Sequence, residues 1–137
     1  FDMEPVVAVI SHSNFGSTRS PEAERCRTAV DIAKRRYPDI VIDGEVQANI
    51  ALDDRLLGDL YPFSDLVGRR VNTLIFPSLS AGNIAYKLLA ELGQAELIGP
   101  VLMGMRRPVQ VLQLGSTVRE IVNMIAFAAA EAQQKGA

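Results

Sequence analysis

The order of apolar and amphipathic segments constrains the fold of this 137-residue chain more than any other feature. Val6–Ile10 is an apolar, largely β-branched run of the kind found in buried parallel strands. Because strands and helices alternate, we expect one α/β unit with a parallel sheet in a three-layer α/β/α arrangement. The further predicted strands are residues 40–42, residues 73–76 and one or two short strands within 99–115, and the predicted helices are residues 21–36, 54–60, 80–93 and 117–134.

The ends of the first helix carry clear local signals. Ser20 suits the N-cap and Pro21 the first helical position, while the pair Tyr37 and Pro38 ends the helix. After the second predicted strand, the residues DGEVQANIALDD (43–54) begin as a polar turn.

Composition excludes several classes of protein. The formal net charge of -2 and a hydrophobic content of 48% give no polycationic surface for nucleic acid. Every apolar stretch is interrupted well before the roughly 18 residues that a membrane span needs. The single cysteine, Cys26, permits neither a disulfide framework nor a cysteine-rich metal site, and with no signal-peptide pattern it favours the cytoplasm.

Four loops that follow predicted strands are candidate ligand loops: SHSNFGS (11–17), DGEVQA (43–48), PSLSAGNIAYK (77–87) and LGSTVRE (114–120). Ligands of parallel α/β sheets bind at the carboxyl ends of the strands, and small or hydroxyl residues there let the backbone approach a phosphorylated ligand. The same residues also form ordinary tight turns, so both interpretations stay open. The candidate acyl-CoA or phosphate-binding residues are Ser13, Asn14, Gly16, Ser17, Gly82, Asn83, Lys87, Arg107, Gly115, Ser116, Thr117 and Glu120.

Other chemistry has less support in the residues. His12 is the only histidine and a conceivable general base, but we interpret it as a loop or strand-end residue, with nothing to suggest a zinc site or a Ser-His-Asp arrangement. We do not expect Asp43 and Glu45 to act as a catalytic carboxylate pair. Glu120 either completes a capping box with Thr117 or acts as an acid or base beside a ligand. Arg107 either reaches phosphate or is a solvated turn residue.

Taken together, the motifs resemble a known family. VIDGEVQANIAL, NTLIFPSLSAGNIAYKLL, AELIGPVLMGMRRPVQVL and GSTVREIVNMIAFAAAEAQ resemble, in order and spacing, the C-terminal part of the phosphate acetyl/butyryltransferase family. More narrowly, SHSNFGS and LQLGSTVREIVNM resemble the version fused to the C-terminus of bacterial hybrid malic enzymes.

This resemblance implies a two-subdomain α/β fold related to the isocitrate and isopropylmalate dehydrogenases, and it corrects the one-unit interpretation. Residues 1–137 are then the C-terminal part of a phosphotransacetylase-like domain within a larger malic enzyme. The resemblance also implies acetyl-CoA in the cleft and self-association through this half. NAD(P) and a divalent metal are expected only in the malic-enzyme part, with no cofactor in this chain.

Active members of the family read Leu-Ser-Arg-Gly where this chain reads LQLG, followed after a few residues by an Asp. The resemblance therefore places Gln113 at the serine that steadies the oxyanion, Leu114 at the arginine that holds phosphate and Glu120 at the carboxylate base. Leu114 carries no charge, and the loss of an oxyanion donor costs on the order of 100- to 1000-fold in rate.

We therefore expect a regulatory acetyl-CoA-binding and oligomerisation domain without catalytic residues. Its parent would oxidatively decarboxylate malate to pyruvate with NAD(P). Two alternatives remain: an active phosphate acetyl- or butyryltransferase and a purely structural dimerisation module. No nucleic-acid or membrane partner is expected.

Overall fold

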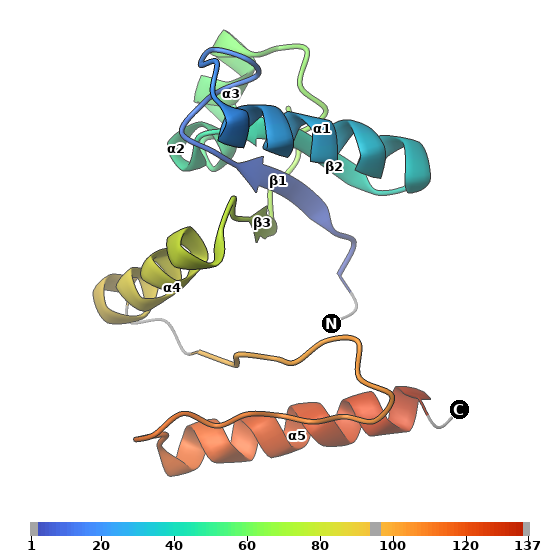
Figure 1. Cartoon of the computed structure of the whole chain (residues 1–137), viewed down its shortest axis with the longest axis vertical. Helices are drawn as coiled ribbons and strands as arrows, with labels where there is room; N and C mark the ends of the chain where they lie inside the picture. Colours follow the sequence, from blue (N-terminus) through green and yellow to red (C-terminus); the bar gives the residue numbers. More distant parts are fainter. Residues whose placement is uncertain (1–2, 94–96, 136–137) are drawn as a thin grey trace. The chain divides into compact units, whose positions relative to one another are not determined.

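The computed structural model describes residues 3–93 and 97–135, which fall into two compact units. The first comprises Phe1–Tyr86 and the second Lys87–Ala137, so the boundary lies within helix α4 (Leu79–Gly93). Figure 1 shows the elements of both units along the chain. The parallel sheet lies entirely in the first unit.

Three parallel strands form the sheet of the first unit: β1 (Val6–Ile10), β2 (Val41–Val46) and β3 (Thr73–Ile75), in the order β2-β1-β3. Ala8 in the central strand pairs with Asp43 on one side and Leu74 on the other. The expected parallel α/β architecture is confirmed. The switch in strand order at β1 is important because ligands of open α/β sheets bind where the order reverses.

Alternation along β1 produces three layers in this unit. Ala8 and Ile10 belong to a buried cluster with residues of the short helices α2 (Ala48–Ala51) and α3 (Asp54–Leu60). Val9 belongs to a second cluster, with Cys26 and Val30 of α1 (Pro21–Arg36). Because successive strand side chains point to opposite faces, α1 covers one face of the sheet and α2 with α3 the other.

The local signals around α1 are confirmed. The Ser20 hydroxyl accepts a hydrogen bond from the Ala23 N–H at 3.1 Å, and Pro21 is the first helical residue. The backbone N–H of Tyr37 donates to the Ala33 carbonyl as the helix ends. The predicted α3 and β3 are also present.

The prediction of a turn at Asp43 is wrong, because β2 continues to Val46 and leads directly into α2, which was not predicted. Turn-forming residues stay in the strand because both of its acidic side chains find partners. Gly44 has a φ of +138°, and a Cβ there would lie 2.6 Å from the carbonyl oxygen of Val9. Glycine therefore lets β2 approach β1 closely at this bend.

In the second unit, α5 (Val118–Lys135) forms close to the predicted bounds. The short strands expected in residues 99–115 do not form, and the region holds one isolated antiparallel bridge between Val101 and Gln110. Prolines 100 and 108 and several glycines interrupt the segment, which explains why no regular strand develops there. Across residues 3–93 and 97–135, no helix is both long and apolar enough to cross a membrane.

Candidate functional site

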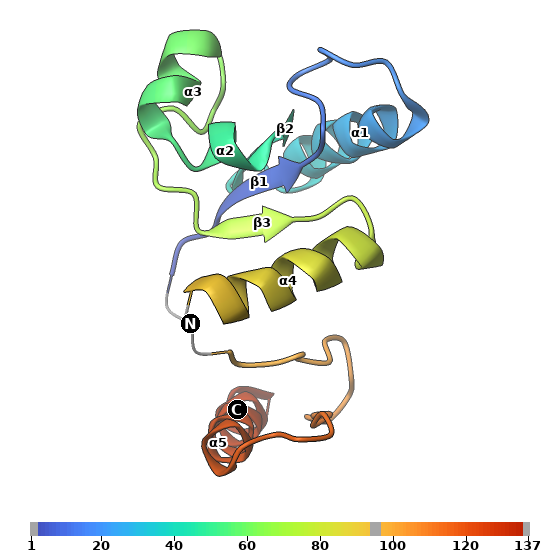
Figure 2. The same ribbon diagram turned by 90° about the vertical axis from the view of Figure 1, so that its left-hand side faces the viewer.

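The carboxyl ends of β1 and β3 lie at the same end of the sheet, where Figure 2 shows both arrowheads. A guanidinium N–H of Arg25 in α1 donates to the carbonyl of Pro77, just after β3, at 3.2 Å. This contact joins the helix that follows β1 to the segment that follows β3. The candidate loops after both strands therefore border the β1/β3 switch point, where a ligand is expected.

The loop after β1 is built around the carboxylate of Glu45 in β2. Glu45 is fully buried, and its Oε1 accepts hydrogen bonds from the Ser13 hydroxyl and the Gly16 N–H, both at 2.8 Å. The guanidinium of Arg27 in α1 lies 3.5 Å from the same oxygen. The other carboxylate oxygen, Oε2, is buried without a hydrogen-bond partner among the described residues. The loop thus surrounds an anion supplied by its own chain.

Further hydrogen bonds hold the same loop in one conformation. The Ser13 hydroxyl accepts from the Thr18 N–H at 3.0 Å, and the Ser17 hydroxyl accepts from the Asn14 N–H at 2.9 Å. The Asn14 side-chain oxygen accepts from the Gln47 N–H at 2.7 Å, which ties the loop to the residue after β2. The structure thus brings Ser13, Asn14, Gly16 and Ser17 together. The Ser13 hydroxyl and the Gly16 N–H, however, already donate hydrogen bonds to Glu45.

A crevice opens beside this loop at the N-terminal end of α1. Its lining residues are Gly16, Arg19, Ser20, Pro21, Glu24 and Arg27. Sequence reasoning missed Arg19 and Arg27. Arg19 lies just before a predicted helix N-terminus, where anions bind, and Arg27 lies nearly two turns inside that helix; the position of Arg19 was the signal that could have identified the site.

His12 lies in the loop after β1, as predicted, and is exposed. Its Nδ1 is 3.5 Å from a carboxylate oxygen of Glu22, and its Nε2 is 3.4 Å from the Ser20 hydroxyl oxygen. No local sequence pattern indicates this grouping, because Ser20 and Glu22 are eight and ten positions from His12. These long, solvent-exposed contacts fit a surface interaction at the start of α1.

Asp43 belongs to a separate ion-pair network beside β2. Its carboxylate accepts from Lys34 Nζ and from the Ser64 hydroxyl, both at 2.8 Å, and Lys34 also contacts Asp65 at 2.7 Å. Burial lowers the pKa of Lys34, but hydrogen bonds and charge attraction from the two aspartates raise the pKa above its ordinary value. Asp43 and Glu45 thus have different partners, and they do not form a catalytic carboxylate pair.

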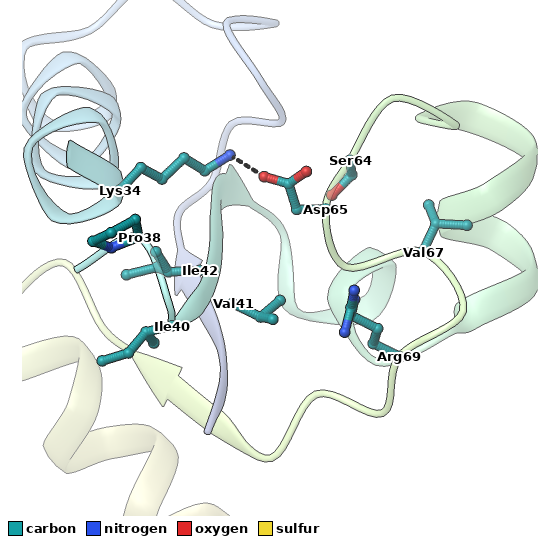
Figure 3. A pocket seen from close by; sticks show the side chains of 9 residues that line it. All are labelled: Lys34, Pro38, Ile40, Val41, Ile42, Ser64, Asp65, Val67 and Arg69. Carbon is teal, nitrogen blue, oxygen red and sulfur yellow. Dashed lines mark hydrogen bonds and ion pairs between the residues drawn. The ribbon is translucent and has the colours of Figure 1, made fainter. Parts of the chain in front are cut away.

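Figure 3 shows a pocket beside this network, along the outer edge of β2. Apolar side chains from both sides of the strand line it together with Lys34, Asp65 and Arg69. The sequence did not single out any of these residues for a site. The Lys34–Asp65 pair occupies one end, so the pocket offers few free polar groups for ligand recognition.

Gly82 and Asn83 lie near the start of α4, after β3. The Ser78 hydroxyl accepts from the Ala81 N–H at 3.2 Å, and a Cβ at Gly82 would lie 3.6 Å from Cβ of Phe76. Lys87 is exposed one turn further along the helix, in the portion assigned to the second unit. Gly82 and Asn83 therefore share the first unit with the loop after β1, whereas Lys87 does not.

The remaining predicted site residues lie in the second unit. Gly115 has a φ of +89°, and the Ser116 hydroxyl donates to the Gln113 carbonyl at 2.9 Å. A Glu120 carboxylate oxygen accepts from the Thr117 N–H at 2.6 Å, and the Glu120 N–H donates to the Thr117 hydroxyl at 3.2 Å. These bonds form the predicted capping box. The backbone N–H and the hydroxyl of Thr117 both donate to the Glu120 carboxylate, which lowers the pKa of Glu120.

Two further positions of the second unit, the candidate residue Arg107 and Leu114, have exposed side chains. Arg107 is exposed before Pro108, and Leu114 is fully exposed at 107%. Within residues 3–93 and 97–135, no three His, Cys, Asp or Glu side chains come together as metal ligands.

These features define a class: a parallel α/β protein with polar loops at the carboxyl edge of its sheet. Residues 1–129 match the family model described as phosphate acetyl/butaryl transferase. This chain therefore belongs to the phosphate acetyl/butyryltransferase family.

Individual relatives agree with this assignment. The chain is 45% identical over 135 residues to the NADP-dependent malic enzyme of Haemophilus influenzae, covering 98% of this chain and 18% of that protein. It is 45% identical over 131 residues to the phosphate acetyltransferase of Thermoanaerobacterium thermosaccharolyticum, covering 96% of this chain and 40% of that protein. The solved phosphotransacetylase of Streptococcus pyogenes superposes with a TM-score of 0.89 at 36% identity, covering 97% of this chain and 40% of that one. The chain thus spans less than half the length of these relatives.

Proposed function

We propose that this chain is a regulatory domain of a malic enzyme, binding acetyl-CoA without transferase activity. The parent would oxidatively decarboxylate malate to pyruvate with NAD(P) and a divalent metal, both bound outside this chain. Similarity to NADP-dependent malic enzymes of Haemophilus influenzae and Escherichia coli, at 45% and 42% identity, supports this parent. The observation that carries the proposal is the fully exposed, uncharged Leu114, where the resemblance implies a phosphate-holding arginine.

Three positions account for the proposed loss of catalysis. A hydrogen bond from a charged group to phosphate contributes about 1.5 to 3 kcal/mol, and Leu114 supplies none. Gln113 provides an amide donor in place of a hydroxyl. Glu120 accepts from Thr117 in the capping box, and its lowered pKa makes it a weaker proton acceptor.

Groups in another part of the chain support the proposed ligand binding. The crevice beside α1 contains Arg19 and Arg27, and the adjoining loop after β1 is fixed by internal hydrogen bonds. A rigid loop beside two guanidinium groups suits the phosphate groups of a CoA ester, because little ordering entropy is lost on binding.

Self-association is part of the proposal. Val118, Val122 and Ile125 are exposed in α5 at a spacing of three and four residues, so they form an apolar stripe on one helix face. Such a stripe suits a helix interface between two copies of the protein. Light scattering of the full-length protein tests it: Val122→Glu should shift the oligomer towards smaller species, whereas an unchanged mass would contradict the assignment.

The regulatory function is tested on the full-length enzyme. Malate-dependent NADP reduction is measured with and without saturating acetyl-CoA, and calorimetric titration measures binding directly. We expect acetyl-CoA to bind and to lower malate oxidation, because an effector shifts an equilibrium between two enzyme states that it binds with different affinity. Identical malate kinetics with and without bound acetyl-CoA would refute the regulatory function.

A catalytic function is the second candidate, because a phosphate acetyltransferase is as similar to the chain as the malic enzyme is, at 45% identity each. It predicts acetyl-CoA formation from acetyl phosphate and CoA by the unmodified protein. We expect none, and we expect the double variant Gln113→Ser, Leu114→Arg to gain measurable activity. Turnover by the unmodified protein would favour the catalytic function instead.

A further inference from the structure

Three separate features hold the guanidinium of Arg27 at the crevice beside α1. Its Nη1 lies 3.5 Å from Oε1 of Glu45, and its Nη2 lies 3.1 Å from a carboxylate oxygen of Glu24. The third feature is the space left by Gly16, which has no side chain. A Cβ at this position would lie only 2.7 Å from Arg27 Nη1 and would displace the guanidinium. The Arg27 side chain nevertheless remains 31% exposed. The cation is therefore oriented and still accessible.

Glu45 is the fixed member of this arrangement. Hydrogen bonds from Ser13 and Gly16 set the direction of its carboxylate, which has no exposed surface. Its second oxygen is buried without a partner among the described residues, and an unsatisfied buried acceptor is costly. Besides ordering the loop after β1, Glu45 contacts the Arg27 guanidinium from the buried side and so sets its direction.

Two arginines and one glutamate line the crevice, and the buried carboxylate of Glu45 lies behind Arg27. The arginines are Arg19 and Arg27, and Glu24 is the opposing carboxylate among the lining residues. Glu24 already contacts Arg27, and its side chain is 72% exposed, so solvent weakens its effect. A guanidinium group matches the geometry of a phosphate group and binds it through two parallel N–H donors.

We propose that Arg27, positioned by Glu45 and Gly16, binds a phosphate group of the acyl-CoA ligand. This inference rests on the proposed function, because it names the group through which that ligand is held. Arg27 is then a specificity-determining residue that touches the ligand, and Glu45 is a positioning residue that acts through it.

The first experiment measures the dissociation constants of acetyl-CoA and acetyl-pantetheine for the full-length protein by calorimetry. Acetyl-pantetheine has the acyl-thioester arm but no phosphate. We expect Arg27→Gln to weaken acetyl-CoA binding by about 10- to 100-fold, the range for a hydrogen bond to a charged group, and to leave acetyl-pantetheine unaffected. Arg35→Gln, an exposed arginine of the same helix, is the matched control and should change neither constant.

The second experiment tests Glu45. Glu45→Gln keeps an oxygen that accepts from Ser13 and Gly16, but it removes the charge that attracts Arg27. We expect a loss of acetyl-CoA affinity smaller than that of Arg27→Gln, with no further loss when the two changes are combined. Non-additivity of this kind shows that Glu45 acts through Arg27. Thermal unfolding of each variant confirms that it is folded.

The outcomes separate the two proposals. Wild-type binding of acetyl-CoA that Arg27→Gln leaves unchanged would overturn this inference and leave the proposed function standing. Equal weakening of acetyl-CoA and acetyl-pantetheine would overturn it by showing a structural role only. Fully additive effects of the two variants would overturn the role of Glu45. A wild-type protein that binds neither ligand would overturn the proposed function and this inference together.

Discussion

The backbone N–H of Gly16 donates to the carboxylate of Glu45 at 2.8 Å, which joins the loop after β1 to the end of β2. The bond places a glycine next to a buried carboxylate and close to the guanidinium of Arg27. One neighbouring pair of strands thus supplies both the loop and the charge that orders it. The order of the loop therefore depends on residues nearly thirty positions apart in the sequence.

Replacing Gly16 with alanine should destabilise the first unit. Gly16 has a φ of +90°, which side chains rarely adopt, and the new Cβ would press on Arg27. We expect a loss of about 1 to 2 kcal/mol in the free energy of unfolding, mainly from the backbone conformation. Urea denaturation measures it, with Gly93→Ala as control, because a Cβ at that position would meet nothing within 4 Å and its φ is not positive. Equal stability of the Gly16 variant and wild type would contradict the prediction.

Removing the cap of α1 should have a smaller, well-defined effect. Ser20→Ala deletes the hydroxyl that accepts the Ala23 N–H, leaving that donor to water. We expect about 1 kcal/mol of destabilisation, and Ser20→Asp should recover most of it because aspartate is also a good N-cap. Chemical denaturation followed by circular dichroism checks both variants. A destabilised aspartate variant would show that the hydroxyl does something other than cap the helix.

Alkaline pH should weaken the network around Lys34. Its pKa is raised in the folded protein above the ordinary value of 10.5, so its contribution is complete below that value. The contribution is then lost as pH rises through the folded pKa, because the unfolded chain releases the proton first. Unfolding free energies measured from about pH 8 to 11 should fall more steeply for wild type than for Lys34→Met. Parallel curves for the two proteins would disprove the linkage.

Acidic pH should weaken the capping box of α5. The backbone and side-chain hydrogen bonds from Thr117 lower the pKa of Glu120 below its ordinary value of 4.5. Its stabilising effect is therefore present above that value and is lost as pH falls through the lower, folded pKa. Helix content followed from neutral to acidic pH should show an acid component that Glu120→Gln lacks. Because Glu120 is at the surface, added salt should reduce the difference.

The sequence predicted most of the regular elements because their signals are local. Val6–Ile10 is apolar throughout, and Ser20 with Pro21 begins a helix in almost any context, so β1 and α1 were placed correctly. The extension of β2 was not predictable, because Asp43 and Glu45 favour turns unless distant partners hold them. The short strands expected before α5 do not form, because an apolar run makes a strand only where a neighbouring strand pairs with it. The sequence does not show whether such a neighbour is present.

The sequence by itself determined the parallel α/β class, the helix caps and the loop after β1 in which candidate ligand groups lie. Hydrophobic periodicity and capping are properties of neighbouring residues, so they are readable without a fold. Only the tertiary structure showed that Glu45 lies within the loop after β1 and orients Arg27 at the crevice beside α1. That arrangement depends on two strands and a helix meeting, and no local pattern encodes which distant charge will be buried beside which loop.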